Sequence, residues 1–295
     1  MPYTHVGAVT GANKGIGLAV VRQLALQYPK SALHKSDPES QGLLIYLTAR
    51  DKSRGEAAVR SLYEEDAQLK KAKALKKDGG WADIKFHQLD IRDTMSIRGL
   101  AEYLRGEHGE GAVDFVVNNA GIAMDGFDNN VVKTTLECNY YGSLEATQDF
   151  LPLLKPNGRL INVSSIVGKL NKYSESIRSR FLNARSVEEV TALMEEFKAA
   201  VEAGKEKEQG WPSAAYAVSK AGMTAMTKVI AREEQDRGGK RLINACCPGY
   251  VNTDMSKHRG SKTPDQGAQT PVMLAIEEIG GASGEFWQNE RVIEW

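Results

Sequence analysis

Short apolar runs alternate with longer amphipathic stretches along this chain. The runs have the composition of strands buried on both faces of a sheet. They predict strands at His5–Val9, Leu43–Leu47, Ile84–Leu89, Val113–Val117, Arg159–Val163, Leu242–Cys246 and Gly284–Gln288. Because helical patterns separate these runs, the sequence predicts an α/β fold built on a doubly wound parallel sheet of about seven strands.

Helical periodicity fills most of the intervals. The interval Asp51–Lys77 is long and charged and favours helix. Pro264 follows Thr263 at a first helical position, and Gln266 completes a capping box, which predicts a helix start. Further helices are expected over residues 18–28, 97–104 and 134–150, and from the region of Tyr216 to Asp236.

Two stretches depart from this alternation. Pro29–Gln41 has no periodicity and is expected to be a surface insertion, to which we assign no role. Residues 168–210 are rich in Lys, Ser and Glu and contain a helix whose start, at Ser186 and Glu189, fits a capping box. One face of that helix is an apolar stripe typical of a packing surface: Val187, Val190, Leu193, Met194, Phe197 and Val201. Since no repeat or linker divides the chain, residues 1–295 are expected to form a single domain.

Charge and cysteine content exclude several classes of protein. Lys and Arg number 38, as do Asp and Glu, so neither nucleic acid nor an anionic membrane is expected as a partner. No apolar run approaches the roughly 20 residues that span a bilayer, and the first strand begins too near Met1 to leave room for a signal peptide. Cys138, Cys246 and Cys247 have the spacing of neither a disulfide framework nor a zinc site. We therefore expect a reducing, cytoplasmic setting and no metal.

A glycine-rich segment joins the first strand to the first helix. Thr10 is followed by Gly11, Gly15 and Gly17. Such a segment brings backbone N–H groups to a phosphate at a helix N-terminus, and glycines allow an approach that side chains would block. An ordinary loop is the alternative, since the spacing differs from the G-x-G-x-x-G fingerprint. Its place between strand and helix favours a dinucleotide site.

Two basic residues lie where a dinucleotide-binding sheet would contact the adenosine ribose. Arg50 lies just past the second strand, where an acid would accept from a 2′-hydroxyl but an arginine suits a 2′-phosphate. Lys14 supplies a second cation from the glycine-rich segment. Taken singly, each is better explained as an ordinary solvated charge, but the two together at these places predict NADPH rather than NADH. Asp90, past the third strand, either accepts from the adenine amino group or is a turn carboxylate.

Polar residues also follow the fourth and fifth strands. Residues 118–121, at the end of the fourth strand, can tie strands together while letting a ligand approach. Asn139 lies inside an expected helix, where it is either exposed or uses its amide to hold a water or a backbone carbonyl. Ser164 and Ser165 follow the fifth strand at the edge where ligands bind in open parallel sheets. Each is either a catalytic hydroxyl or a helix cap, and spacing alone does not separate them.

Tyr216 and Lys220 form the pair around which the other motifs are arranged. At i and i+4 of a helix, their side chains project from one face. A phenol has a pKa near 10, and a nearby ammonium favours its ionised form, so the pair is a credible general acid for a proton that is transferred to an oxygen. The alternative is that Tyr216 and Lys220 merely share one face of a helix and have no catalytic role.

Together these motifs resemble the short-chain dehydrogenase/reductase family. The likeness rests on Thr10–Gly17, Asn118–Gly121, Asn139, Ser165, Tyr216-x-x-x-Lys220 and Pro248-Gly249, which occur in the family's order. The chain is especially similar to the monomeric NADPH-dependent carbonyl reductases over residues 11–17, 47–51, 86–91, 162–166, 210–213, 244–249 and 291–295. The resemblance implies a Rossmann-type fold. It also implies that the insertion covers the face through which other members oligomerise, which would make the protein a monomer.

The resemblance implies catalytic roles for four residues. Tyr216 would protonate a carbonyl oxygen as hydride arrives from nicotinamide, and Ser165, favoured over Ser164 by the likeness, would hydrogen-bond that oxygen. Lys220 would hold the nicotinamide ribose and lower the pKa of Tyr216. Asn139 would position a water in the proton path.

The resemblance also implies cofactor and substrate contacts. Cofactor contacts would come from Gly11, Asn13, Lys14, Gly15, Ile16, Gly17, Arg50, Asp90, Ile91, Asn118, Ala120, Gly121, Pro248, Gly249, Val251 and Thr253. Candidate substrate contacts are Ile166, Trp211, Tyr250 and Met255. Cys247 would be a buried structural thiol or a contact for glutathione.

We therefore expect an NADPH-dependent reductase that converts ketones, aldehydes or quinones into alcohols. One alternative is a reductase dedicated to a single metabolite ketone. Another is an NADPH-binding sensor or scaffold without turnover, which would have no need of the four catalytic residues. Residues after Ile166 lie where substrate contacts differ within the family, so the resemblance implies no particular substrate.

Overall fold

One eight-stranded sheet runs through the centre of the molecule. The computed structural model describes residues 3–37 and 39–295, and the strand order is β3-β2-β1-β4-β5-β6-β7-β8. Every pairing is parallel except that of β7 with β8. The strands are β1 His5–Val9, β2 Leu43–Ala49, β3 Ala82–Gln88, β4 Val113–Asn118, β5 Leu154–Val163, β6 Leu242–Cys247, β7 Phe286–Gln288 and β8 Arg291–Val292. The seven predicted strands are confirmed, and β8 adds a short antiparallel edge.

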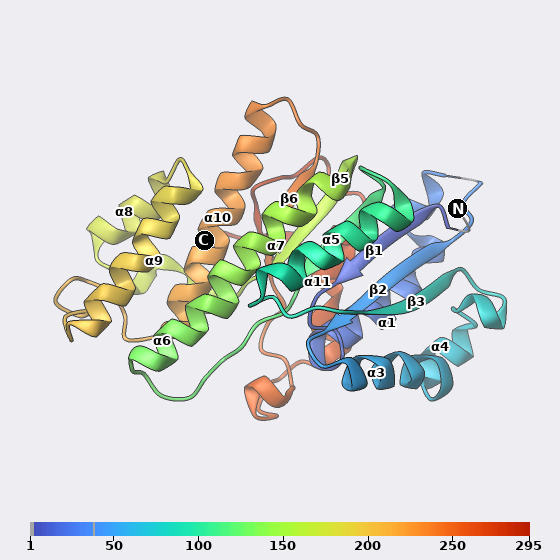
Figure 1. Ribbon diagram of the computed structural model, residues 1–295, viewed down its shortest axis with the longest axis horizontal. Helices are drawn as coiled ribbons and strands as arrows, with labels where there is room; N and C mark the ends of the chain where they lie inside the picture. The colour runs from blue at the N-terminus through green and yellow to red at the C-terminus, as the bar shows by residue number, and fades with distance from the viewer. Residues whose placement is uncertain (1–2, 38) are drawn as a thin grey trace.

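Helices cover both faces of this sheet (Figure 1). They are α1 Gly15–Gln27, α2 Ala32–Lys35, α3 Lys52–Glu64, α4 Ala67–Ala72, α5 Thr94–His108, α6 Asn129–Leu136, α7 Ser143–Phe150, α8 Glu175–Asn183, α9 Val187–Glu202, α10 Ala215–Asp236 and α11 Pro264–Ile276. Side chains alternate between the faces, so Ala8 and Val9 of β1 belong to different cores. One core includes residues of α5, α7 and α10, and the other includes residues of α1, α3 and α11. This arrangement confirms the doubly wound α/β fold.

The order of the strands reverses between β1 and β4. Starting from β1, the chain first builds outward through β2 and β3 and then returns to place β4 on the other side. In such sheets the connections on the two sides of the reversal diverge and leave a crevice at the carboxyl ends of the strands. The loops that follow β1, β4, β5 and β6 therefore meet at this edge.

The predicted helix over residues 134–150 is interrupted in the structure. Between α6 and α7 lies a π-helical turn, η3, spanning Glu137–Gly142. Gly142 is pressed against the loop after β3, since a Cβ on it would lie 2.2 Å from the Ile91 carbonyl oxygen. Single π turns inside helices are often found at functional sites, and this one carries Asn139.

The long interval predicted as helix after β2 also divides. Asp66 caps α4 by accepting hydrogen bonds from Gln68 N and Leu69 N, which ends the preceding helical segment. Lys73 then ends α4 in the left-handed region, with φ of 49°. The single stretch therefore becomes α3, α4 and a 3₁₀ turn at Lys76–Asp78, designated η2.

The first insertion is more regular than its sequence indicates. It begins with a 3₁₀ turn at Tyr28–Lys30, η1, and continues into α2. The Tyr28 hydroxyl and Ser40 Oγ are 2.6 Å apart and close the segment. The ring of His34 lies between those of Tyr28 and Trp81, with centroid distances of 5.0 and 4.7 Å. Pro38, inside the predicted insertion, lies outside the described residues.

The second insertion forms the helix pair α8 and α9 beside α10 (Figure 1). It begins with two 3₁₀ turns, η5 at Ile166–Gly168 and η6 at Leu170–Lys172. Ser186 caps α9 by accepting from Glu189 N, as predicted, but the Glu189 carboxylate accepts from Arg185 N. All six residues of the predicted apolar stripe are buried, and α9 packs on α6 and α10. Across the described part of the chain, no helix is long and apolar enough to cross a membrane.

Candidate active site

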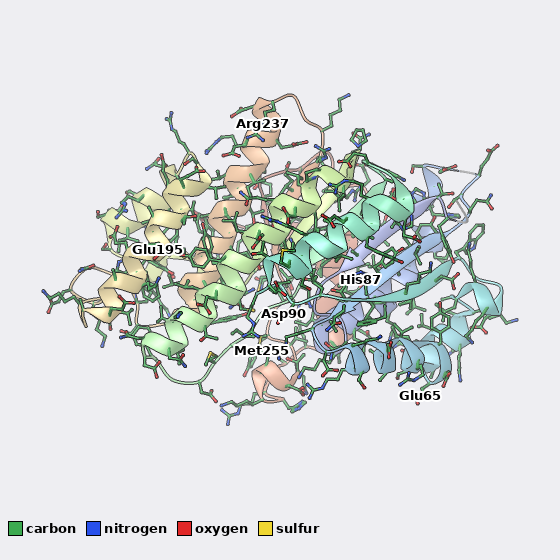
Figure 2. All side chains as sticks on the ribbon, in the orientation of Figure 1. Glu65, His87, Asp90, Glu195, Arg237 and Met255 are labelled. Atoms are coloured by element: carbon green, nitrogen blue, oxygen red, sulfur yellow. The ribbon has the colours of Figure 1, made fainter. Side chains whose placement is uncertain are left out.

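A cavity of about 740 Å³ opens at the carboxyl edge of the sheet, at the reversal of strand order. Asp90 reaches it from the loop after β3 and Met255 from the loop after β6, and both are labelled in Figure 2. Most predicted site residues line it: Gly11, Asn13, Lys14, Gly15, Ile16, Gly17, Arg50, Asp90, Ile91, Ala120, Gly121, Tyr216, Lys220, Pro248, Thr253 and Met255.

The loops after β1 and β4 hold each other at the floor of this cavity. Thr10 Oγ1 accepts from the backbone N–H groups of Asn119 and Ala120, at 3.0 and 2.9 Å. The Asn119 side chain donates back to the carbonyls of Thr10 and Gly11. A Cβ on Gly17 would lie 2.6 Å from Asn119 Nδ2, so glycine is required there by close approach. Of the predicted segment 118–121, Asn119, Ala120 and Gly121 line the cavity and Asn118 does not.

Asn118 instead belongs to a buried polar network behind the cavity. Its Nδ2 donates to Asn162 Oδ1 at 3.0 Å and to Thr147 Oγ1 at 3.2 Å. Asn162 in turn donates to Thr227 Oγ1 of α10 at 2.9 Å. Asn118 therefore connects β4, β5 and the helix that carries Tyr216, and the prediction of a direct cofactor contact does not fit.

The N-terminus of α1 points its backbone amides toward the cavity. Lys14 is the N-cap residue in extended conformation, and no side chain caps the helix. The first turn contains no acidic residue, so the positive end of the helix dipole is uncompensated by neighbours in sequence. Thr253 lies above this turn, since a Cβ on Gly15 would be 3.4 Å from Thr253 Cγ2. Such a turn fits a phosphate.

Four cationic side chains border one end of the cavity: Lys14, Arg50, Arg54 and Arg92. Lys14 Nζ is 2.6 Å from Asp254 Oδ2, and both side chains are exposed. The hydrogen bond from Lys14, with the charges of Lys14 and His258, lowers the pKa of Asp254. The excess of cations fits a phosphorylated ribose. The sequence analysis missed Arg54, which lies in the first turn of α3, four residues after Arg50.

Tyr216 and Lys220 project from the first turns of α10, as predicted. Lys220 is 3% exposed, and its Nζ donates to the Val163 carbonyl at 2.8 Å and lies 5.7 Å from the centroid of the Tyr216 ring. Burial lowers the pKa of Lys220 to about 8. Burial also raises the pKa of Tyr216 to about 12; the Cys247 thiol adds to this rise and a hydrogen bond with Ser165 opposes it. The prediction that Lys220 lowers the Tyr216 pKa is therefore not met, because desolvation of the phenol dominates.

The two adjacent serines occupy different environments. Ser164 is buried, and its hydroxyl donates to the Lys220 carbonyl at 3.0 Å and lies 2.7 Å from Thr224 Oγ1. Ser165 is partly exposed and accepts a hydrogen bond from Val167 N at 3.3 Å, and its hydroxyl lies near enough to the Tyr216 phenol to oppose the rise of the phenol's pKa. Although Ser164 borders the cavity, its hydroxyl is hydrogen-bonded to residues of α10. Ser165 is the serine whose hydroxyl meets the phenol.

Asn139 connects the loop after β4 to α10. It is fully buried, and its Oδ1 accepts from Ile122 N while its Nδ2 donates to Ile122 O, both at 2.8 Å. Nδ2 also donates to Ser219 Oγ at 3.1 Å, and Ser219 Oγ donates to Tyr216 O at 2.8 Å. Both amide hydrogens are thus used within the protein. Of the predicted alternatives, the amide holds a backbone carbonyl, that of Ile122, and the role in positioning a water stays a prediction.

The predicted substrate residues divide into two groups. Ile166, Tyr250 and Met255 are exposed on loops at the carboxyl edge, although of these Met255 alone lines the cavity. Trp211 is 2% exposed and packs against Tyr173, Phe181 and Phe197 inside the second insertion. The prediction for Trp211 was wrong because its place before the catalytic helix does not reveal the aromatic cluster that buries it.

Two predicted cofactor residues after β6 also lie off the cavity. Val251 is buried, with Gly267 of α11 packed against it so closely that a Cβ would lie 2.5 Å from Val251 Cγ2. Gly249 adopts φ of 90° and donates its N–H to Cys247 Sγ. The sequence analysis missed several residues that do line the cavity: Asp51, Arg54, Leu89, Arg92, Ile122, Ala123, Cys138, Val163, Asn252, Asp254, His258 and Pro264.

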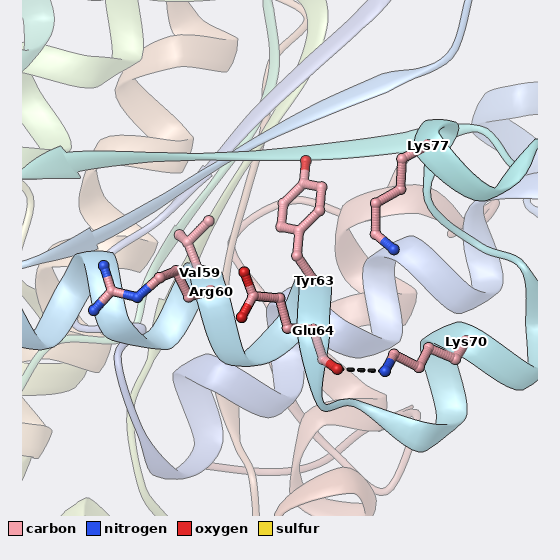
Figure 3. Close-up of a pocket in the computed structure, with 6 residues that line it drawn as sticks. All are labelled: Val59, Arg60, Tyr63, Glu64, Lys70 and Lys77. Atoms are coloured by element: carbon pink, nitrogen blue, oxygen red, sulfur yellow. Dashed lines mark hydrogen bonds between the residues drawn. The ribbon is translucent and has the colours of Figure 1, made fainter.

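A second hollow, of about 570 Å³, lies on α3 and the segment after it (Figure 3). It is lined by Val59, Arg60, Tyr63, Glu64, Lys70 and Lys77. Lys70 Nζ donates to the Glu64 carbonyl across its floor. None of the predicted catalytic residues borders this hollow, so the chemistry belongs to the larger cavity.

Comparison with known proteins agrees with this geometry. Residues 5–177 and 198–264 match the family described as short chain dehydrogenase. The chain is 40% identical to human carbonyl reductase [NADPH] 1, over 99% of this chain and 98% of that protein. The Bos taurus protein of the same name is 39% identical over 98% of each chain.

Solved structures give the same result. Salutaridine reductase from Papaver somniferum superposes with a TM-score of 0.78 at 26% identity, covering 96% of this chain and 99% of that one. Menthone neomenthol reductase from Mentha piperita gives 0.74 at 27% identity, covering 96% and 98%. On the family match and the full-length similarity together, the chain belongs to the short chain dehydrogenase family.

Proposed function

We propose that this protein reduces carbonyl compounds (ketones, aldehydes or quinones) to alcohols, with NADPH as the hydride donor. The observation that carries the proposal is that Tyr216 and Lys220 line the same cavity as the glycine turn after β1 and the cations Lys14, Arg50 and Arg54, with Ser165 next to the phenol. The full-length similarity to proteins named NADPH carbonyl reductases supports the same activity.

The cavity fits a phosphorylated dinucleotide along its length. The glycine turn and the uncapped start of α1 suit a pyrophosphate. Lys14 and Arg50 would pair with a 2′-phosphate, and Asp90 would face the adenine. When bound, NADPH supplies hydride from its nicotinamide ring.

Within this proposal, the protein's own residues control the proton. With a pKa of about 12, the Tyr216 phenol is protonated at neutral pH, so it meets a carbonyl oxygen as an acid. Ser165 would donate a second hydrogen bond to that oxygen as negative charge develops. Lys220, with a pKa of about 8, is mainly cationic at pH 7 and would hold the ribose next to the phenol. Asn139 and Ser219 fix the turn from which Tyr216 projects.

A reductase dedicated to one metabolite ketone is the second candidate. The similarity to structures named for single metabolites, salutaridine and menthone, favours it. The same site would act in both cases, and the two differ in the range of carbonyl compounds accepted. A substrate panel separates them.

We further propose that residues 1–295 act as one cytoplasmic, monomeric NADP-binding domain without nucleic-acid partners. The support is that α9 buries its apolar face on α6 and α10, which removes that surface from contact with a second copy. Light scattering should then give a mass near 32.3 kDa. A stable dimer in solution would contradict the proposal.

The activity is tested by following NADPH absorbance with purified protein and menadione, isatin, a diketone and an aromatic aldehyde. Turnover of several of these is expected for a general carbonyl reductase. Tight NADPH binding with no turnover of any compound would contradict general carbonyl reduction.

A further inference from the structure

Trp295 contacts the turn that follows Ser165, although the two are far apart in sequence. Its indole Nε1–H donates to the Gly168 carbonyl at 3.1 Å, across a separation of 127 residues. Gly168 is the last residue of η5, the 3₁₀ turn that Ser165 caps. The aromatic side chain therefore reaches a segment that begins at a proposed catalytic residue.

The η5 turn has internal hydrogen bonds and packs closely against α10. Gly168 N–H donates to the Ser165 carbonyl at 3.0 Å, and Val167 N–H donates to Ser165 Oγ at 3.3 Å. A Cβ on Gly168 would lie 2.7 Å from Ala221 N and from the Lys220 carbonyl carbon. The turn thus lies between the Trp295 indole on one side and the backbone of Lys220 on the other. Any outward movement of Gly168 would carry Ser165 away from the helix that bears Tyr216.

Trp295 is itself held from two further directions. The segment before it is fixed to the edge of the sheet, since β8 pairs with β7 and Ile293 N donates to Phe286 O at 2.8 Å. The indole also meets the ring of Phe181 edge to face, with centroids 6.2 Å apart and an interplanar angle of 82°. Phe181 packs on Trp211 in the core of the second insertion. The indole therefore joins the sheet edge, the insertion and the Ser165 turn.

We propose that Trp295 is a positioning residue for the reductase site. Its indole N–H holds the Ser165–Gly168 turn against α10 and so fixes the Ser165 hydroxyl relative to Tyr216. The consequence for turnover rests on the proposed function, whereas the restraint on the turn does not. The second insertion contributes through Phe181, which orients the indole ring.

The test compares Trp295→Phe with wild type and with Glu294→Gln, a neighbouring exposed position. Phenylalanine keeps an aromatic ring against Phe181 but has no N–H to donate, so the fold should be retained. Hydrogen exchange of the peptide covering residues 165–169 should become faster in Trp295→Phe and stay unchanged in Glu294→Gln. Equal exchange in Trp295→Phe and wild type would overturn the proposal.

A kinetic readout separates positioning from a general loss of structure. In Trp295→Phe, kcat should fall about three- to tenfold, the rate equivalent of one neutral hydrogen bond, with KM for NADPH unchanged. An unchanged kcat, or a rise in KM for NADPH that matches the fall in kcat, would also overturn the proposal. If wild type shows no turnover, the proposed function fails, and hydrogen exchange alone decides whether Trp295 restrains the turn.

Discussion

The serines after β5 provide a matched pair of substitutions that separates chemistry from folding. Ser165→Ala removes the hydroxyl that meets Tyr216 beside the cavity. If that hydroxyl stabilises a developing oxyanion, kcat should fall about 10²- to 10³-fold, the usual effect of removing one such donor. Its remaining bond, to Val167 N at 3.3 Å, lies in an exposed segment, so the melting temperature should barely change.

Ser164→Ala should show the opposite balance. The Ser164 hydroxyl is 2% exposed and bonds to Lys220 O at 3.0 Å and to Thr224 Oγ1 at 2.7 Å. Because Thr224 Oγ1 also donates to Lys220 O at 3.1 Å, neither partner is left fully unpaired. The free energy of unfolding should therefore fall by about 1–2 kcal/mol. For a chain of 295 residues that corresponds to roughly 2–3 °C in melting temperature.

The assay measures NADPH oxidation at saturating cofactor, together with thermal unfolding followed by circular dichroism. The predicted pattern is a large loss of kcat at nearly constant melting temperature for Ser165→Ala, and a lower melting temperature with a smaller kinetic effect for Ser164→Ala. Equal losses of kcat in the two variants, or a Ser165→Ala variant with normal kcat, would refute the assignment of Ser165.

Two further predictions concern charged groups of the cavity. Arg50→Asp should raise the Michaelis constant for NADPH about 10- to 100-fold more than that for NADH, the value of one charge-assisted hydrogen bond. Arg60→Asp, in the helix α3 that follows Arg50 and outside the cavity lining, is the control. Equal effects on both cofactors would exclude a 2′-phosphate contact. Lys220→Met tests the pH dependence of stability. Burial lowers the Lys220 pKa from 10.5 to about 8, so between pH 8 and pH 10.5 the unfolded chain binds more protons than the folded chain. The free energy of unfolding of the wild type therefore rises with pH across this range. Below pH 8 the buried charge lowers the free energy of unfolding by up to about 3 kcal/mol. Any gain in stability of Lys220→Met over wild type should therefore shrink between pH 8 and pH 10.5. A difference in stability between the two proteins that grows over this range would be inconsistent with a lowered Lys220 pKa.

The sequence predicted the parts of the fold that depend on local pattern. Parallel strands buried on both faces are apolar throughout, so β1, β2 and β4 were visible as short runs. The start of α11 was equally visible, because Thr263 and Gln266 form both hydrogen bonds of a capping box.

The errors arose where distant contacts decide the outcome. The π turn that carries Asn139 contacts Ile122 through two hydrogen bonds and the Ile91 carbonyl through Gly142, and both of these partners are distant in sequence. The resemblance assigned Asn118 to the cofactor, whereas its side chain bonds to Asn162 and Thr147 on the neighbouring elements. A sequence pattern predicts that a residue lies at the edge of a sheet, but it does not predict the direction in which the side chain points.

The central claim, that Tyr216 delivers the proton, is tested most directly with Tyr216→Phe. Phenylalanine keeps the ring and removes only the hydroxyl, so NADPH affinity, measured by fluorescence titration, should stay within about twofold. NADPH oxidation with a substrate turned over by wild type should fall by at least about 10²-fold. A variant that binds NADPH normally and still turns over at the wild-type rate would contradict the account.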